Sequence, residues 1–334
     1  KGFLPTEDID QIFCMTEAAQ GVSFKDMIRH QRELAIIAMN NPDVLHSMSS
    51  VGAGGPNVSG NTGRIFMHLK PRNQRKLSAS QIVEKLRPQF ARVPGIKIFL
   101  QLPPTIRIGG QLTKSLFQVT MQSSDTKLLY EKTAEMEKRL REVPLLQDVN
   151  TDMQISSPQI NVHIDRDKAA ALGISASSIE DALSSAYGSR MISTIFAPSN
   201  QYRVIVELMP EYRDTPDTMP LLYVRSDKGA LVPLKAIVEL KSSSGPLLVN
   251  HLFQLPSATV SFNIKPGGSL GDAVTQVTKI ANEVLPASVS YKFQGQAEAF
   301  QKSLNDLGAL LIVAIIVIYL VLGILYESFI HPIT

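Results

Sequence analysis

The 334-residue sequence predicts an α+β fold: two ferredoxin-like split-βαβ sandwiches with an inserted mixed α/β domain, followed by one transmembrane α-helix. Three observations predict it. A strand, an amphipathic helix, a proline and a second strand follow one another four times along the chain. A long segment separates the third copy from the fourth, and an uncharged apolar stretch lies near the C-terminus. Two tandem βαβ units form a split-βαβ sandwich, with the helices on one face of an antiparallel sheet.

The first two copies adjoin and predict one sandwich at residues 1–109. Ser23 is the expected N-cap of the first helix and Pro42 its end, because serine accepts from free N–H groups and proline cannot continue a helix. In the second copy, apolar residues recur at helical spacing until Pro94. The expected elements are a strand at 12–18, a helix between Ser23 and Pro42, a strand at 44–51, a strand at 64–69, a helix at 80–93 and a strand at 96–101.

The third and fourth copies predict a second sandwich at residues 112–165 and 251–300, with Gly109-Gly110 at the junction. Because the two copies are separated in the chain, strands 116–121 and 258–264 are expected to pair in one sheet around an insertion. The remaining expected elements are a helix at 125–143, a strand at 146–149, a helix at 269–285 and a strand at 289–294.

The intervening residues 166–250 predict an inserted mixed α/β domain. Ser175 is the expected N-cap of a helix at 176–187, and Gly188 is expected to end it at the C′ position. Two hairpins follow from alternating strands around turn residues. They are expected at 191–196 with 201–208, and at 221–225 with 231–234.

A transmembrane helix is expected at 304–327, because no charge occurs between Asp306 and Glu327. About twenty helical residues span the roughly 30 Å of a bilayer core. The chain begins with Lys1 rather than Met and ends soon after the apolar stretch, so we expect a piece of a longer protein.

The composition argues against several classes of protein. The net charge is +3, 6% of residues are aromatic and Trp is absent, so no nucleic-acid partner is expected. Cys14 is the single cysteine, and the methionines form no cluster, so neither a Cys-based metal site nor a soft-metal relay is expected. The sequence lacks GxSxG, GxxxxGK[ST], HExxH and CxxC motifs, which predicts that the chain is not an enzyme and takes no cofactor.

The loop at 52–63 contains five glycines between two strands of the first sandwich. A dinucleotide fingerprint is not indicated, because the third glycine is misplaced and a strand follows. Two interpretations remain: a connector, or a gate that moves over a binding cleft.

Several motifs resemble the second periplasmic half of resistance-nodulation-division (RND) multidrug efflux permeases. They are Gly2-Phe3-Leu4-Pro5-Thr6-Glu7-Asp8, Asn61-Thr62-Gly63, the run from Asp165 to Ile174, and Leu325-Tyr326-Glu327-Ser328. The hydrophobe/amphiphile efflux branch fits best, and residues 192–196 and 200–204 are similar to the Mdt-type permeases. The chain would then end inside the eighth transmembrane helix.

The resemblance implies that the two sandwiches are porter subdomains and the insert a docking subdomain. The whole protein would be a proton-driven antiporter that exports amphiphilic, drug-like molecules and so confers antibiotic resistance. It would form a homo- or heterotrimer in the inner membrane of a Gram-negative bacterium, with most of this chain in the periplasm. Its partners would be a periplasmic adaptor protein and an outer-membrane channel. The proton-carrying residues would lie outside this chain.

The resemblance also places substrate-binding residues in a cleft between the two sandwiches, which a Gly-Gly hinge would allow to open and close. The glycine loop resembles the switch loop of the family, with Ala53 and Gly55 where relatives carry phenylalanines. The strand at 96–101 carries aliphatic side chains where relatives carry aromatic ones. The expected substrate-binding residues are Met15, Glu17, Gly52, Ala53, Gly54, Gly55, Ile98, Leu100, Leu102, Arg107, Asn150, Asp152, Thr259 and Ser261.

Two alternatives stay open. A heavy-metal RND exporter would require a methionine cluster in the cleft, and Met15 alone does not provide one. A non-transporting, membrane-anchored assembly module would use the same sandwiches only for association.

Overall fold

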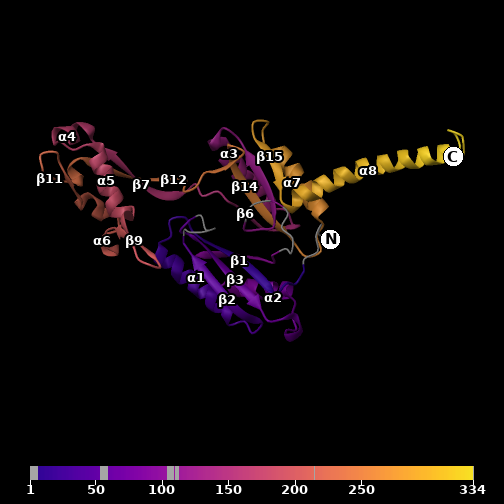
Figure 1. Ribbon diagram of the computed structural model, residues 1–334, viewed down its shortest axis with the longest axis horizontal. Helices are drawn as coiled ribbons and strands as arrows, with labels where there is room; N and C mark the ends of the chain where they lie inside the picture. Colours follow the sequence, from indigo (N-terminus) through magenta and orange to yellow (C-terminus); the bar gives the residue numbers. More distant parts are fainter. Residues whose placement is uncertain (1–6, 53–58, 104–108, 110–112, 214, 334) are drawn as a thin grey trace. The chain divides into compact units, whose positions relative to one another are not determined.

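The computed structural model describes residues 7–52, 59–103, 109, 113–213 and 215–333, and for residues 304–309 only the course of the backbone. The chain forms two compact units (Figure 1). One comprises Lys1–Ile155 and Pro246–Thr334, and the other comprises Ser156–Gly245. The second unit is therefore continuous and interrupts the first, with ends that differ from the predicted insertion at 166–250.

The first sandwich has the order β1α1β2β3α2β4, with strands arranged β2-β3-β1-β4. All three strand pairs are antiparallel. This is the split-βαβ topology that the first two copies of the repeat predict. Its elements are β1 (Gln11–Ala18), α1 (Phe24–Met39), β2 (Val44–Val51), β3 (Thr62–Leu69), α2 (Ala79–Phe90) and β4 (Ile96–Gln101).

Side-chain caps fix where the helices of this sandwich begin. The Ser23 hydroxyl accepts a hydrogen bond from the Asp26 N–H, and Ser78 forms a reciprocal capping box with Gln81. The helices then bury one apolar face against the sheet, where their side chains meet alternate residues of the strands. The core includes Met27, Leu34, Leu86, Phe90, Ile12, Cys14, Ile65 and Met67.

The second sandwich repeats this topology with strands from both sides of the insertion. Its sheet runs β13-β14-β5-β15, and β6 pairs with β14. β14 pairs with β5 in antiparallel register, so the predicted pairing of these two segments is confirmed. The elements are β5 (Phe117–Gln122), α3 (Thr126–Arg141), β6 (Leu146–Thr151), β13 (Asn250–Leu252), β14 (Leu255–Ile264), α7 (Leu270–Val284) and β15 (Ser290–Gln294).

The inserted unit is built on two long strands that pair with each other although they are far apart in the sequence (Figure 1). Helix α5 begins at the predicted cap, Ser175, but Gly188 ends it at φ −92° rather than in the left-handed region. Glycine is needed there for space, because a Cβ would lie 2.6 Å from the Ser184 carbonyl oxygen. The elements are β7 (Ser157–Ile164), α4 (Arg166–Ala171), α5 (Ala176–Tyr187), β8 (Arg190–Phe196), β9 (Gln201–Val206), α6 (Pro210–Arg213), β10 (Tyr223–Arg225), β11 (Leu231–Pro233) and β12 (Val238–Gly245).

The last helix, α8 (Gln296–Leu325), carries the segment predicted to cross a membrane. From residue 310 to residue 325 most of its large apolar side chains are exposed. Within the parts of the chain that the structure describes, no helix meets the combined length and hydropathy needed to span a bilayer. The transmembrane helix expected at 304–327 is thus not confirmed.

Candidate functional site

A cleft of about 540 Å³ lies in the first unit, between β1 and β4 of the first sandwich and α3 and β6 of the second. Ala18, Ala19, Phe99 and Met153 contribute apolar surface, and five charged side chains are added by both sandwiches. The complete lining is Glu17, Ala18, Ala19, Gln20, Gly95, Ile96, Lys97, Phe99, Lys114, Glu137, Arg141, Val149, Asn150, Thr151 and Met153.

Strand alternation directs the side chains of the first sandwich into this cleft. On β1, Ile12 and Cys14 pack into the core against the helices, so Met15 and Glu17 belong to the opposite face. On β4, Leu100 packs into that core, so Lys97 and Phe99 belong to the opposite face. Both strands therefore turn their charged residues away from the helices.

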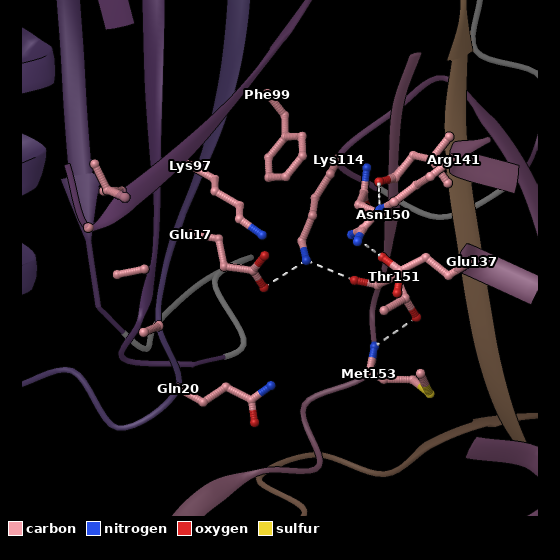
Figure 2. Close-up of a pocket in the computed structure, with 15 residues that line it drawn as sticks. Glu17, Gln20, Lys97, Phe99, Lys114, Glu137, Arg141, Asn150, Thr151 and Met153 are labelled. Carbon is pink, nitrogen blue, oxygen red and sulfur yellow. Dashed lines mark hydrogen bonds and ion pairs between the residues drawn. The ribbon is translucent and has the colours of Figure 1, made fainter. Parts of the chain in front are cut away.

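Lys114 joins the two walls of the cleft (Figure 2). Its Nζ lies 2.7 Å from Oε1 of Glu17 and donates to the Thr151 carbonyl oxygen at 2.8 Å. The same ammonium group lies 5.7 Å from the centre of the Phe99 ring, within cation–π range. The side chain of Lys114 is 12% exposed, so this ion pair is screened less than one on the open surface.

Lys97 is the cross-strand neighbour of Glu17, and both side chains point into the cleft (Figure 2). No hydrogen bond or ion pair joins the Lys97 side chain to another of the described residues. Lys97 is exposed. The cleft therefore presents one cation that is free to meet a ligand.

Glu137 and Arg141 complete the charged set from α3. The Arg141 guanidinium donates to Oε1 of Glu137 at 2.6 Å. Burial raises the pKa of Glu137, and the nearby Arg141 charge opposes this effect. Among the described residues, no group of three or more His, Cys, Asp or Glu side chains is arranged to hold a metal ion.

A buried polar network lies on the second sheet beside the cleft. The Ser261 hydroxyl donates to Oδ1 of Asn150 at 2.9 Å, and the hydroxyls of Thr120 and Thr259 are 2.9 Å apart. Asp152 accepts from the Thr259 N–H at 2.7 Å. Burial raises the pKa of Asp152, while this hydrogen bond lowers it.

A second cleft, of about 350 Å³, lies on another side of the same unit. It contains Leu100, Leu102 and Phe117 together with Arg87, whose guanidinium pairs with Asp148 of the second sandwich at 2.7 Å. This cleft is lined mainly by aliphatic and uncharged polar groups and does not contain the charged set of the larger cleft.

A family model described as the AcrB/AcrD/AcrF family matches residues 1–334. The chain belongs to this family.

The chain is also similar to two crystal structures of a heavy metal efflux pump. It is 20% identical to crystal form II, with a TM-score of 0.84 over 99% of this chain and 35% of that one. It is 21% identical to crystal form I, with a TM-score of 0.83 over 96% of this chain and 34% of that one. The likeness shows a shared fold, and this AcrB/AcrD/AcrF family member spans about a third of the length of those chains.

In this AcrB/AcrD/AcrF family member, the predicted site residues do not gather in one place. Glu17 and Asn150 line the larger cleft, whereas Leu100 and Leu102 line the smaller one. Ile98 packs against the first core instead of facing the cleft, because it shares the face of Leu100. Met15 is half-buried on the cleft-facing side of β1, and Asp152, Thr259 and Ser261 are part of the polar network.

The predicted gate lies partly outside the described residues, because Ala53, Gly54 and Gly55 are not placed. Arg107, which was predicted elsewhere in the cleft, also lies outside them. Gly52 adopts φ +95°, a conformation that glycine favours, and a Cβ there would meet the Phe24 ring at 2.8 Å. Beyond the loop, Asn61 donates to the Ala18 carbonyl oxygen at 3.1 Å. The Gly52 N–H donates to the Thr62 carbonyl oxygen at 3.1 Å, so hydrogen bonds hold both described ends of the loop on the first sandwich.

Most residues that line the larger cleft were not predicted, among them four charged ones. On β4, the aliphatic residues Ile98 and Leu100 were expected to bind substrate, but they face the core. A charged residue at alternate spacing, Lys97, marks the opposite face and is the signal that identifies it. The missed charged residues are Lys97, Lys114, Glu137 and Arg141, and the missed apolar ones include Phe99 and Met153.

Proposed function

We propose that this chain supplies the porter and docking parts of the second periplasmic half of an RND efflux transporter, and that its larger cleft binds amphiphilic, drug-like molecules. The cleft carries the proposal: about 540 Å³ is within the range of small-molecule sites. Phe99 and Met153 offer apolar contact, and the charged groups beside them offer orientation.

The family supports proton-driven export by the whole protein as an antiporter, with the proton-carrying residues outside this chain. We place the transporter in the inner membrane, with most of this chain in the periplasm. The exposed apolar side chains of α8 from 310 onward support that position.

We assign the inserted unit to docking against a periplasmic adaptor and an outer-membrane channel, within a homo- or heterotrimer. The β8–β9 hairpin supports this part of the proposal, because its large apolar side chains are exposed. They include Ile192, Ile195, Phe196, Tyr202 and Ile205. Exposed apolar surface of this kind marks interaction sites.

The proposal is tested by filling the cleft. Ala19 is exposed and lines it, so Ala19→Trp in the full-length transporter should obstruct ligand entry. We expect the efflux rate of an amphiphilic dye to fall about tenfold, which corresponds to about 1.4 kcal/mol of lost binding. The matched control is Ala134→Trp, at an exposed position on α3 outside the cleft, which should leave efflux unchanged.

Normal dye efflux by the Ala19→Trp variant at normal protein level would contradict the proposed binding role. If the wild-type trimer assembled normally but exported no dye, the sandwiches would serve assembly alone.

A heavy-metal exporter is the second candidate, favoured by the similarity of this chain to the two structures of a heavy metal efflux pump. Met153 and Glu17 are possible ligands in the cleft, but Lys97, Lys114 and Arg141 oppose a cation there. Resistance to copper, silver or zinc ions that depends on Met153, without dye efflux, would favour this candidate.

A further inference from the structure

We propose that Lys97 and Lys114 form an anion subsite in the larger cleft, so that this transporter prefers amphiphiles carrying a carboxylate next to an aromatic or apolar body. The inference rests on the proposed function of the cleft and names the class of ligand that it takes.

The charge balance of the cleft favours an anion. Its lining contains three cations, Lys97, Lys114 and Arg141, and two anions, Glu17 and Glu137. Each carboxylate has an ion-pair partner, Lys114 for Glu17 and Arg141 for Glu137. Lys97 has none among the residues that the structure describes, so a bound monoanion would neutralise the remaining charge.

The geometry places Lys97 where a ligand carboxylate could contact both Lys97 and Lys114. Lys97 stands directly across from Glu17 on the neighbouring strand, and Glu17 lies 2.7 Å from Lys114 Nζ. Both ammonium groups are directed toward the Glu17 carboxylate and so toward the same region of the cleft (Figure 2). A ligand carboxylate there would accept from Lys97 and compete with Glu17 for Lys114.

The groups around the two lysines fit the rest of such a ligand. The Phe99 ring lies 5.7 Å from Lys114 Nζ and presents an aromatic surface beside the cation. Met153 and Ala19 extend the apolar lining. A cationic amphiphile would find both carboxylates already paired and would meet Lys97 as a like charge.

The test compares two probes that differ in one charge: dansylglycine, a carboxylate, and its neutral methyl ester. Their dissociation constants for the purified full-length transporter are measured by fluorescence. We expect the wild type to bind dansylglycine more tightly, and Lys97→Gln to reduce this preference about fivefold, the size of one solvent-accessible ion pair. Lys97→Arg should restore the preference, and added salt should weaken it in the wild type.

The matched control is Lys279→Gln, which removes an exposed lysine of α7 outside the cleft and should leave the preference unchanged. The inference is overturned if the Lys97→Gln variant keeps the wild-type preference, or if both probes weaken equally. It is also overturned if the wild type binds the ester as tightly as the acid. Binding of neither probe to the wild type would contradict the proposed function itself, and the anion subsite with it.

Discussion

At the scale of single residues, two aspartates of the same unit have opposite electrostatic environments. Asp8 lies beside Arg75, whose side chain is fully buried and donates to it at 2.9 Å. Asp8 also accepts from the Ala79 N–H at the start of α2. These contacts, led by the Arg75 hydrogen bond, lower the pKa of Asp8 to about 2. Asp152 differs because burial raises its pKa.

The Asp8 shift predicts acid sensitivity. A depressed folded-state pKa stabilises the fold above the unfolded value of about 3.9, and this contribution is lost as the pH falls toward 2. Asp8→Asn should lower the free energy of unfolding at pH 7 by about 1 kcal/mol, allowing for solvent screening. The free energy of unfolding of this variant should also depend less on pH in the acid range. Urea denaturation between pH 2 and pH 7 measures both effects. Asp217→Asn, at an exposed aspartate without an ion pair among the described residues, should have no effect at pH 7.

The Asp152 shift predicts the opposite sign. The pKa of Asp152 is raised in the folded state, so the folded protein keeps the proton at a higher pH than the unfolded chain does. The free energy of unfolding therefore declines as the pH rises from the unfolded-state pKa through the folded-state pKa. Asp152→Asn keeps an oxygen to accept from the Thr259 N–H and removes the buried charge. The Asn250 amide, which donates to the other Asp152 oxygen at 2.9 Å, can turn over to present its own oxygen to the new NH2 group. We expect this variant to be as stable as the wild type at pH 7 or more stable in urea denaturation. A marked loss of stability at pH 7 would refute this account of Asp152.

At the scale of elements, a bulge in β6 carries Asp148, which forms an ion pair between the two sandwiches. Ser261 pairs with Asn150 and Asn263 with Gln147, so Phe262 faces two residues, Asp148 and Val149. Asp148 adopts φ +53°, the left-handed conformation typical of the first residue in one class of bulge. This conformation allows its carboxylate to accept from Arg87 of α2 at 2.7 Å and from Asn263 at 3.1 Å.

Two substitutions at Asp148 separate the backbone from the ion pair. Asparagine tolerates the left-handed conformation and can keep an acceptor, whereas alanine does neither. Asp148→Asn should therefore cost about 1 kcal/mol of unfolding free energy through the lost charge pair. Asp148→Ala should cost about 1 to 2 kcal/mol more. Urea denaturation measures both losses of unfolding free energy. Equal losses in the two variants would show that the left-handed conformation at residue 148 does not add to the destabilisation.

At the scale of the whole molecule, the two units are joined where the chain leaves and re-enters the first unit at neighbouring points. Gln154 and Leu248 are bridge partners, and the Leu247 N–H donates to the Gln154 carbonyl oxygen at 2.8 Å. The inserted unit has its own core, formed by Ala169, Ile174, Ile179, Val224, Leu234 and Ile237. Each unit thus has the core that independent folding requires.

This junction predicts that the inserted unit can be removed. Replacing residues 156–245 by a short Gly-Ser turn should leave the first unit folded, because the flanking residues already lie side by side. Hydrogen exchange should then show wild-type protection in β5, β14 and α7. Loss of protection across that sheet would mean that its two halves require the inserted unit in order to pair.

Most of the secondary structure was predictable because its signals are local. Ser23, Asp125, Ser175 and Ser269 are N-caps in the structure, and each accepts a hydrogen bond from an N–H three residues later. The topology was also predictable, because a strand–helix–strand repeat has few ways to bury its helices. The candidate site was predicted less well: Glu17 and Asn150 line the larger cleft, but its lysines were missed.

By itself, the sequence determined the two sandwiches and the interruption of the second one, because hydrophobic period and capping act over a few residues. Only the tertiary structure decided which strand face meets the cleft and which distant charges come together there. The alternation on β4 separates Ile98 and Leu100 from Lys97 and Phe99, but it does not say which set meets α3 and β6. Lys114 and Glu17 are 97 residues apart in the chain and pair only because both sandwiches have formed. Such contacts depend on long-range packing, which no local pattern in the chain encodes.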